Sequence, residues 1–241
     1  LERLCRSKDQ RITAVRGSGI AETSYELALL DSEGGSAQCR GTLFTASLSC
    51  KAEAGGDSQM GGDFGYAHHW KNLKLDDIAS EAARTAVELL GAQPVPTRTC
   101  PAILRNNVVA DLLDFLSGSF SAESMDKGRS LLAGKVGTKM FSPLVTLWDD
   151  GLLAGGIATS AFDGEGTPSQ KTALVRGGII ENALYDLYYA RKAGKKATGN
   201  ASRGIKSPPS IGTTSLVLEA GSLSLEKLAR ETLPQIAESV I

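Results

Sequence analysis

The sequence predicts an α+β fold that mixes helices and antiparallel sheets in two subdomains. Two helix-like segments, residues 76–90 and 106–120, stand among groups of short extended runs. These segments do not alternate regularly, as the strands and helices of a doubly wound parallel sheet would. Glycine contributes 27 of the 241 residues and aromatic residues only 5%, a composition typical of a turn-rich globular protein.

The first part of the chain indicates a long hairpin. Residues 24–30 have the composition of a strand, residues 31–35 that of a turn, and residues 37–54 alternate as a longer strand. Residues 55–66 are so rich in glycine that we expect turns or bulges there, in place of a regular element, before the chain becomes extended again.

Apolar spacing predicts the two helices. In residues 76–90 the apolar positions recur at helical intervals, and Gly91 follows where a C-cap would lie. Residues 106–120 carry a second apolar face. Between them Pro94, Pro96 and Pro101 predict a loop, which leads into a short strand at residues 102–104. Further strands are predicted at 144–148, 178–184 and 215–218, and a last helix from Ser224 that is interrupted or shifted at Pro234.

Charge and composition exclude several classes of function. With 26 basic and 27 acidic residues the net charge is -1, so no global field attracts nucleic acid or an anionic membrane, and direct nucleic-acid binding is not expected. The basic residues 191–196 are interpreted as a solvated loop. Four widely spaced cysteines, no membrane-length apolar run and no signal peptide predict a cytoplasmic protein. Because the first residue is not methionine, we expect a fragment of a longer protein.

Few residues suit catalysis. The two histidines, His68 and His69, are adjacent, so their side chains diverge and are poorly placed to chelate one metal ion. No nucleophile elbow accompanies any serine. Asp149 and Asp150 are interpreted as a turn cap, and residues 163–166 as a flexible acidic loop. Residues 196–204, with their glycines and small polar side chains, suit exposed backbone amides that meet a peptide or another strand.

An ordered set of short motifs resembles the TldD/PmbA family, also called modulators of DNA gyrase. The matching segments are Gly128-Arg129-Ser130, Trp148-Asp149-Asp150-Gly151, Phe162 to Pro168, Leu187-Tyr188-Tyr189-Ala190-Arg191-Lys192, Ala197-Thr198-Gly199-Asn200, Ser207-Pro208-Pro209 and Val217-Leu218-Glu219-Ala220-Gly221. The stretch from Gly55-Gly56-Asp57 to Tyr66 fits as well, so that the resemblance extends over nearly the whole chain, and the ordered set is more specific than any single member.

One helix separates the two kinds of subunit in that family. TldD-type members carry His-Glu-x-x-x-His, in which two histidines hold zinc and the glutamate activates a water. When the helix is aligned by Leu112-Leu113 and Gly118, the three motif positions are occupied by Asp114, Phe115 and Ser119. The resemblance therefore implies a PmbA/TldE-like member with no catalytic residue and no metal ligand set of its own.

The resemblance further implies residues 1–98 as the remainder of an N-terminal α+β domain with the long hairpin, and 99–241 as an incomplete C-terminal domain. It implies a dimer with a TldD-type subunit that carries zinc, or with a second copy, and unfolded peptides as substrates of a metallopeptidase complex. Candidate peptide or partner contacts are Arg191, Thr198, Gly199, Asn200 and Asp163. Two alternatives stay open: a self-sufficient peptidase with an unrecognised site, and a gyrase-modulating binding protein.

Overall fold

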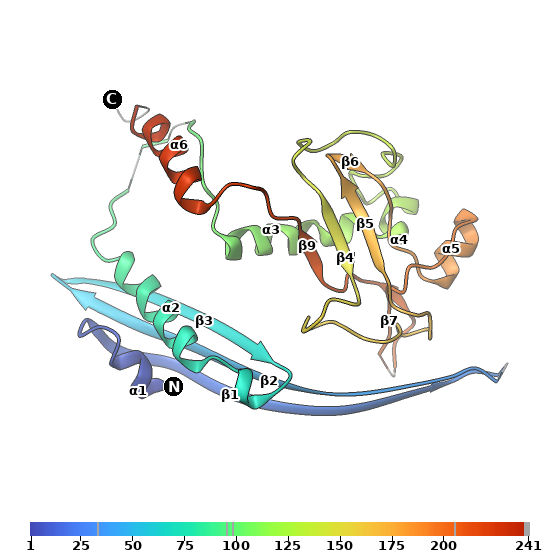
Figure 1. Cartoon of the computed structure of the whole chain (residues 1–241), viewed down its shortest axis with the longest axis horizontal. Helices are drawn as coiled ribbons and strands as arrows, with labels where there is room; N and C mark the ends of the chain where they lie inside the picture. Colours follow the sequence, from blue (N-terminus) through green and yellow to red (C-terminus); the bar gives the residue numbers. More distant parts are fainter. Residues whose placement is uncertain (33, 95, 98, 205, 239–241) are drawn as a thin grey trace. The chain divides into compact units, whose positions relative to one another are not determined.

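The structure, a computed structural model, describes residues 1–32, 34–94, 96–97, 99–204 and 206–238, with side chains up to residue 232. The chain forms two compact units, Leu1–Ala28 with Gln38–Pro96, and Leu29–Ala37 with Thr97–Ile241. Figure 1 shows the order of the elements. Among the described helices, none combines the length and apolar character needed to cross a membrane.

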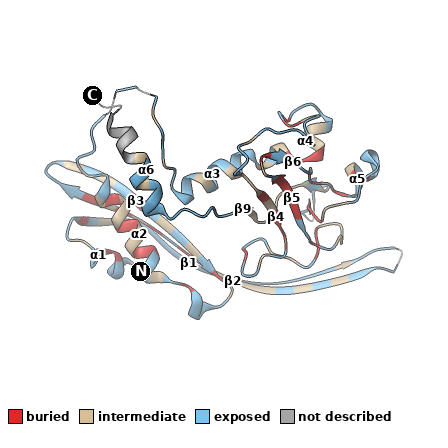
Figure 2. Cartoon of the chain, turned by 45° about the horizontal axis from the view of Figure 1, so that its top comes forward, coloured by how far each residue is buried: buried red, intermediate tan, exposed pale blue. Residues whose placement is uncertain are grey.

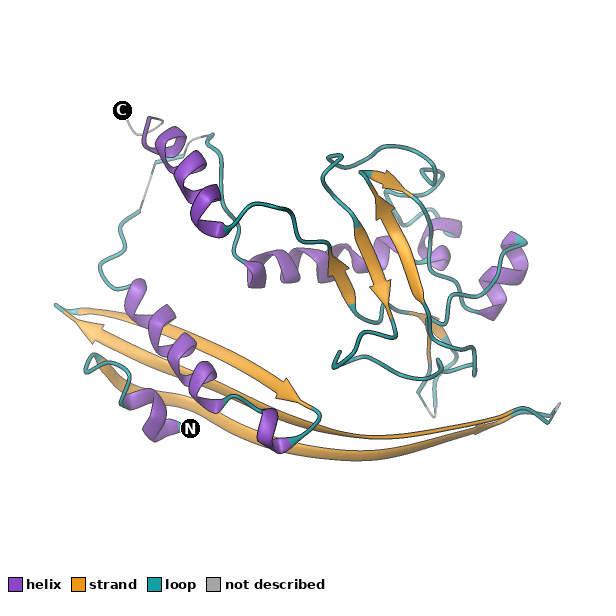
Figure 3. Ribbon diagram, viewed as in Figure 1, coloured by secondary structure: helices purple, strands orange, loops and turns teal. Residues whose placement is uncertain are grey.

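A three-stranded sheet forms the base of the first unit. Its strands are β1 (Ile12–Leu30), β2 (Ser36–Ala54) and β3 (Asp57–Ala67), with β2 in the centre. β2 and β3 pair antiparallel, with Phe44 opposite Ala67 and Ala54 opposite Asp57 (Figure 3). The predicted hairpin and its turn near residues 31–35 are confirmed, although β1 begins twelve residues earlier than the sequence pattern indicated.

The glycine-rich segment contradicts its prediction, because residues 57–67 form a regular strand. The reason is the close approach of a helix to β3. A β-carbon at Gly61 would lie 2.3 Å from the carbonyl oxygen of Ala82, and one at Gly65 would lie 2.8 Å from Cδ1 of Ile78. These glycines therefore permit packing in this strand, while Gly55 and Gly56 alone, both with positive φ, make the preceding turn.

Three helical segments accompany this sheet: α1 (Glu2–Arg6), the 3-10 turn η1 (Trp70–Asn72) and α2 (Leu75–Glu88). The helix predicted at residues 76–90 is confirmed as α2, and Gly91 follows it with a φ of 76°. Figure 2 shows buried residues on α2 and the sheet beneath it. The core of the unit consists of Cys5, Ile12, Ala46, Leu48, Cys50, Ala52, Ala67, Leu73, Ile78, Ala79, Ala82, Ala83 and Ala86.

The second unit contains most of the remaining helices. They are α3 (Asn106–Ser117), the 3-10 turn η2 (Gly118–Phe120), α4 (Ala122–Asp126), α5 (Leu187–Ala193) and α6 (Leu225–Glu238). The helix predicted at 106–120 is confirmed as α3 with its 3-10 continuation. The strand predicted at 102–104 does not form, because no described strand lies beside it to pair with. The last helix is continuous through Pro234, so the predicted interruption is wrong.

A four-stranded antiparallel sheet, in the order β6-β5-β4-β9, organises this unit. Its strands are β4 (Leu147–Asp150), β5 (Lys171–Arg176), β6 (Ile179–Ile180) and β9 (Leu216–Leu218). β7 (Ala201–Ser202) and β8 (Ser210–Ile211) form a small second sheet. The strands predicted at 144–148 and 178–184 are shifted or shortened, and β5 escaped prediction because its four middle residues are all buried and show no alternation.

The core of the second unit lies on this sheet and the segments that cover it. It consists of Phe120, Leu132, Leu147, Leu174, Val175, Ile180 and Leu184. The apolar face predicted for residues 106–120 is only partly used: Phe120 is buried and Leu113 packs against the core, but no residue of α3 itself is buried.

Candidate functional site

The site is built where the chain leaves α5 and crosses the end of β5. Asp186 begins α5 by accepting a hydrogen bond from the backbone N–H of Tyr189 at 2.7 Å, and Gly194 ends it in the left-handed conformation. The basic stretch is therefore not one solvated loop as predicted. Arg191 and Lys192 lie in the last turn of a helix, and the lysines beyond Gly194 belong to the segment that follows.

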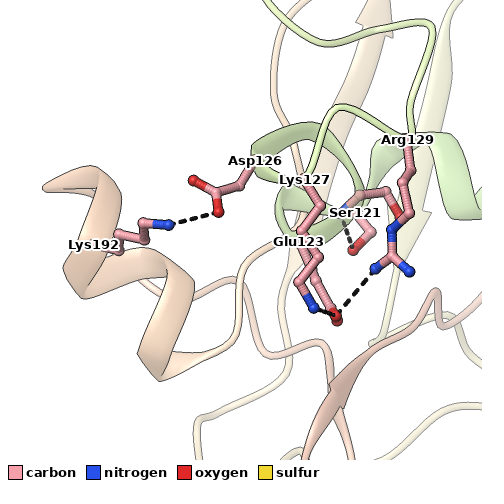
Figure 4. A network of polar contacts seen from close by, with 7 residues as sticks. Ser121, Glu123, Asp126, Lys127, Arg129 and Lys192 are labelled. Carbon is pink, nitrogen blue, oxygen red and sulfur yellow. Dashed lines mark hydrogen bonds and ion pairs between the residues drawn. The ribbon is translucent and has the colours of Figure 1, made fainter.

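One ion pair joins α5 to α4. Lys192 Nζ lies 2.6 Å from Asp126 Oδ2 (Figure 4). On α4 itself, Glu123 accepts from Lys127 at 2.6 Å and from Arg129 at 3.3 Å. These contacts are largely exposed, so each contributes little to stability. They matter for position, because the place where α5 ends is also the place where the segment 195–200 begins.

Thr198 joins this segment to the segment that precedes α5. Its hydroxyl accepts from the backbone N–H of Tyr185 at 2.7 Å and donates to the carbonyl of the same residue at 3.1 Å. The next residue, Gly199, has a φ of 72°, and a β-carbon there would lie 2.6 Å from the carbonyl oxygen of Pro168. Only glycine fits this crossing without displacing the backbone.

A buried carboxylate anchors the following residue. Asp149, on β4, is 1% exposed. Its Oδ2 accepts from Asn200 Nδ2 at 2.6 Å and from Thr214 Oγ1 at 3.0 Å, and its Oδ1 accepts from the Thr214 backbone N–H at 2.6 Å. Burial raises the pKa of Asp149, and the hydrogen bonds from Asn200 and Thr214 oppose that rise. Asp149 is thus a buried strand residue that orders two loops, whereas Asp150 caps the turn as predicted, through the Leu152 N–H at 3.1 Å.

Asp163 has a similar ordering role. Its Oδ1 accepts from the backbone N–H groups of Glu165 and Thr167, both at 2.9 Å. Its Oδ2 accepts from the backbone N–H of Ala201 at 2.9 Å. The loop predicted to be flexible and acidic is therefore a tight turn around a buried carboxylate that is bonded to β7.

An open cavity of about 380 Å³ lies between these elements. The beginning of β5, residues 181–185 and residues 195–198 form its walls. Its polar and aromatic lining consists of Trp148, Gln170, Lys171, Thr172, Arg176, Glu181, Asn182, Tyr185, Lys195, Lys196 and Thr198. Four cations and one carboxylate thus face a single cavity in a chain whose net charge is -1.

Trp148 organises two of these cations. Lys171 Nζ and Arg176 Cζ each lie 4.7 Å from the centroid of its ring, within the range of cation–π attraction. The indole N–H donates to Glu219 Oε1 at 2.8 Å and so fixes the ring. The bulge between Leu147 and Trp148 offsets the register of β4 and β5 at this position.

The five candidate contact residues are thus distributed unevenly. Thr198 lines the cavity, whereas Gly199, Asn200 and Asp163 are buried behind it and order its wall. Arg191 is exposed on α5 and does not line the cavity. Sequence reasoning missed Lys171 and Arg176, although a strand of four apolar or small residues between two cations is a recognisable signal.

The helix aligned with the zinc motif offers no metal site. Phe115 is 86% exposed and has no ligand atom. Asp114 is on α3, while Ser119 lies beyond the α-helix, in η2, where its carbonyl oxygen accepts from Ser130 Oγ at 2.6 Å. Across the described ranges, no three histidine, cysteine or acidic side chains are grouped closely enough to hold a metal ion. The residues present therefore do not fit a bound zinc.

The histidines also have separate places. His68 follows β3, and its Nδ1 lies 2.9 Å from the carbonyl oxygen of Thr42. His69 is the exposed residue that precedes η1. Both belong to the first unit and lie directly after β3.

The two units, each of helices with an antiparallel sheet, define a protein of the α+β class. Family models agree: residues 1–90 match the PmbA/TldA metallopeptidase central domain, and residues 97–236 match the C-terminal domain. The chain belongs to the PmbA/TldD family.

Two curated relatives are similar to most of this chain. An uncharacterized protein of Methanocaldococcus jannaschii is 31% identical over 88% of this chain and 50% of its own length. A metalloprotease TldD homolog of Haemophilus influenzae is 29% identical over 84% of this chain and 44% of its own. The chain therefore spans about half the length of the curated relatives that it matches.

Solved structures show the same fold. A Thermotoga maritima protein described as a candidate modulator of a DNA gyrase is 25% identical, with a TM-score of 0.89 over 95% of this chain and 52% of its own. TldE from Thermococcus kodakarensis is 28% identical, with a TM-score of 0.82 over 96% of this chain and 52% of its own.

Proposed function

We propose that this chain is the noncatalytic, TldE-like part of a TldD/TldE-type metallopeptidase complex that acts on unfolded peptides. The observation that carries the proposal is the chemistry of the aligned helix. A phenylalanine at the glutamate position cannot accept the proton of a zinc-bound water, and Asp114 and Ser119 replace both histidines. In this proposal, zinc and the hydrolytic step belong to a TldD-type partner.

The cavity beside β5 supports a role in binding extended peptide. β6 pairs only with Val175 and Arg176, and the Glu181 N–H and Asn182 Nδ2 donate to the carbonyls of Leu174 and Ala173. Only the start of β5, at Lys171 and Thr172, therefore has no strand on that side among the described elements. An exposed strand edge is a template for backbone pairing with an extended chain. The candidate contact Thr198 lies across the cavity from this edge. The chain would thus admit and orient peptide without cleaving it.

The test is peptidase activity on an unfolded peptide, with the protein alone, with a TldD-type partner, and with the partner alone, together with elemental analysis for zinc. We expect zinc and cleavage to follow the partner, and cleavage to increase when this chain is added. A protein that alone binds stoichiometric zinc and cleaves peptide would contradict the proposal and favour the self-sufficient peptidase. A gyrase-modulating role predicts that adding this chain leaves the zinc content and the cleavage rate of the partner unchanged.

The matched control restores the missing chemistry. A variant with Asp114→His, Phe115→Glu and Ser119→His carries the residue types of the zinc motif. Because Ser119 lies in a 3-10 turn and not in the α-helix, we expect this variant to bind zinc more weakly than a TldD-type partner does. Equal affinity would show that backbone geometry at this helix is no obstacle, and that side-chain identity alone separates the two kinds of subunit.

A further inference from the structure

The cavity beside β5 contains more positive charge than the chain around it. Lys171 and Arg176 each already have a carboxylate nearby: Asp150 Oδ2 lies 3.5 Å from Lys171 Nζ, and Glu181 Oε2 lies 2.7 Å from Arg176 Nε. Lys195 and Lys196 differ, because within the described part of the chain neither forms an ion pair. The cavity therefore has cationic groups with no internal counter-charge.

Trp148 makes part of this charge rigid. A lysine and an arginine on an open surface would sample many rotamers, and their ordering would oppose ligand binding. Here Lys171 and Arg176 are both stacked on one indole ring, which is itself fixed by Glu219. Two cations are thus held at one wall of the cavity before any ligand arrives, which lowers the entropic cost of binding an anion.

We propose that this cavity binds a carboxylate group of an extended peptide, supplied by an acidic side chain or by the C-terminus. The inference rests on the proposed function, which supplies the peptide ligand. It adds the chemical group of the peptide that the cavity recognises. Lys195 and Lys196 meet the carboxylate, while the start of β5, at Lys171 and Thr172, lies beside the peptide backbone.

The dimensions and charge favour a peptide over nucleic acid. A cavity of about 380 Å³ is near the lower limit for small-molecule pockets and admits a side chain, not a duplex. Duplex binding depends on many phosphate contacts along a basic surface, and the net charge of this chain is -1. The indole of Trp148 is already stacked by the protein's own cations, so it is not available for stacking on a base.

The test uses Trp148 as a reporter. The chain has two tryptophans, and the other, Trp70, is in the first unit, so Trp70→Phe leaves Trp148 as the only source of tryptophan fluorescence. Three short unfolded peptides are titrated at low salt: one with a central glutamate and a blocked C-terminus, one with glutamine and a free C-terminus, and one with glutamine and a blocked C-terminus. A single-stranded oligonucleotide of similar length is the fourth ligand.

We expect one or both carboxylate peptides to bind about fivefold more tightly than the blocked glutamine peptide, from two partly exposed cation contacts. Lys195→Gln with Lys196→Gln is expected to abolish most of that preference, and added salt to reduce it. The matched control, Lys135→Gln, removes an exposed lysine that does not line the cavity, and is expected to leave the preference unchanged.

Several results would overturn the inference. Equal affinity for all three peptides refutes carboxylate selection while leaving peptide binding, and hence the proposed function, intact. A preference that survives the double lysine substitution refutes this cavity as the site. If the oligonucleotide binds more tightly than the peptides and the double lysine substitution abolishes that binding, the ligand of the cavity is a phosphate and not a peptide carboxylate. Binding of no peptide refutes both the inference and the peptide-contacting role of this chain.

Discussion

The bond between Asn200 and Asp149 allows a nearly isosteric test of the candidate site. Asn200→Asp replaces the amide nitrogen, 2.6 Å from Asp149 Oδ2, with a carboxylate oxygen at the same place. Two carboxylates that share one buried position cannot both ionise freely, so one of the two pKa values rises. Because a buried charge without its partner costs about 3–5 kcal/mol, we expect about 4 kcal/mol of lost unfolding free energy near neutral pH.

The sign of the pH dependence follows from the direction of the shift. A carboxyl group whose pKa is higher in the folded than in the unfolded protein favours folding when it is protonated, and that stability is lost as the pH rises toward the folded pKa. At low pH, a proton between the two carboxyl groups replaces the N–H of Asn200. Burial already raises the pKa of Asp149 in the native protein, so the variant must be compared with the native protein at each pH.

The assay is urea unfolding in the Trp70→Phe background, where Trp148 reports on the second unit. We expect the difference from the native protein to be small near pH 4 and to increase to about 4 kcal/mol near pH 8. Asn182→Asp is the control, because Asn182 donates to the carbonyl of Ala173 and not to a carboxylate. A difference that does not change with pH would refute the assignment of Asp149 as a buried, charged partner of Asn200.

Two further predictions concern packing and the ordered turn. Gly61→Ala places a β-carbon 2.3 Å from the carbonyl of Ala82, so we expect a loss of about 1–3 kcal/mol in thermal or urea unfolding of the first unit. Gly118→Ala, which meets nothing within 4 Å, is its control and is expected to be neutral. Asp163→Ala leaves three backbone N–H groups without their acceptor, including that of Ala201. We expect it to lower the unfolding free energy by about 2–3 kcal/mol and to accelerate amide exchange at Ala201, and unchanged exchange there would contradict the role given to this carboxylate.

Local patterns predicted the elements whose burial is one-sided. Helix α2 has an apolar stripe on one face, and β2 alternates between buried and exposed positions along its inner half, so each has a period that sequence reveals. Strand β5 is buried on both faces and has no such period. The prediction of turns or bulges in β3 failed for a different reason. Its glycines leave room for α2, which packs on this strand from a later part of the chain.

Some features of the candidate site could be predicted from the sequence, and others could not. The Thr198-Gly199-Asn200 segment was recognisable by its small and polar residues, and the loss of the zinc motif at Asp114, Phe115 and Ser119 was visible from residue types. The sequence could not show that Lys171 and Lys195 line one cavity. Strand pairing and the crossing at Gly199 bring these two residues together, although they are more than twenty positions apart in the chain.

By itself, therefore, the sequence determined the family, the α+β class and the absence of the motif's histidines and glutamate at the aligned positions, since these depend on residue identity and order. The tertiary structure alone decided which polar residues are buried supports and which reach the cavity. Asp163 and Asn200 were candidate contact residues, and Asp149 a candidate turn cap. Their burial and the hydrogen bonds that they form to neighbouring segments make all three supports of the cavity wall. The cations around Trp148 face the solvent because β4 and β5 pair as they do.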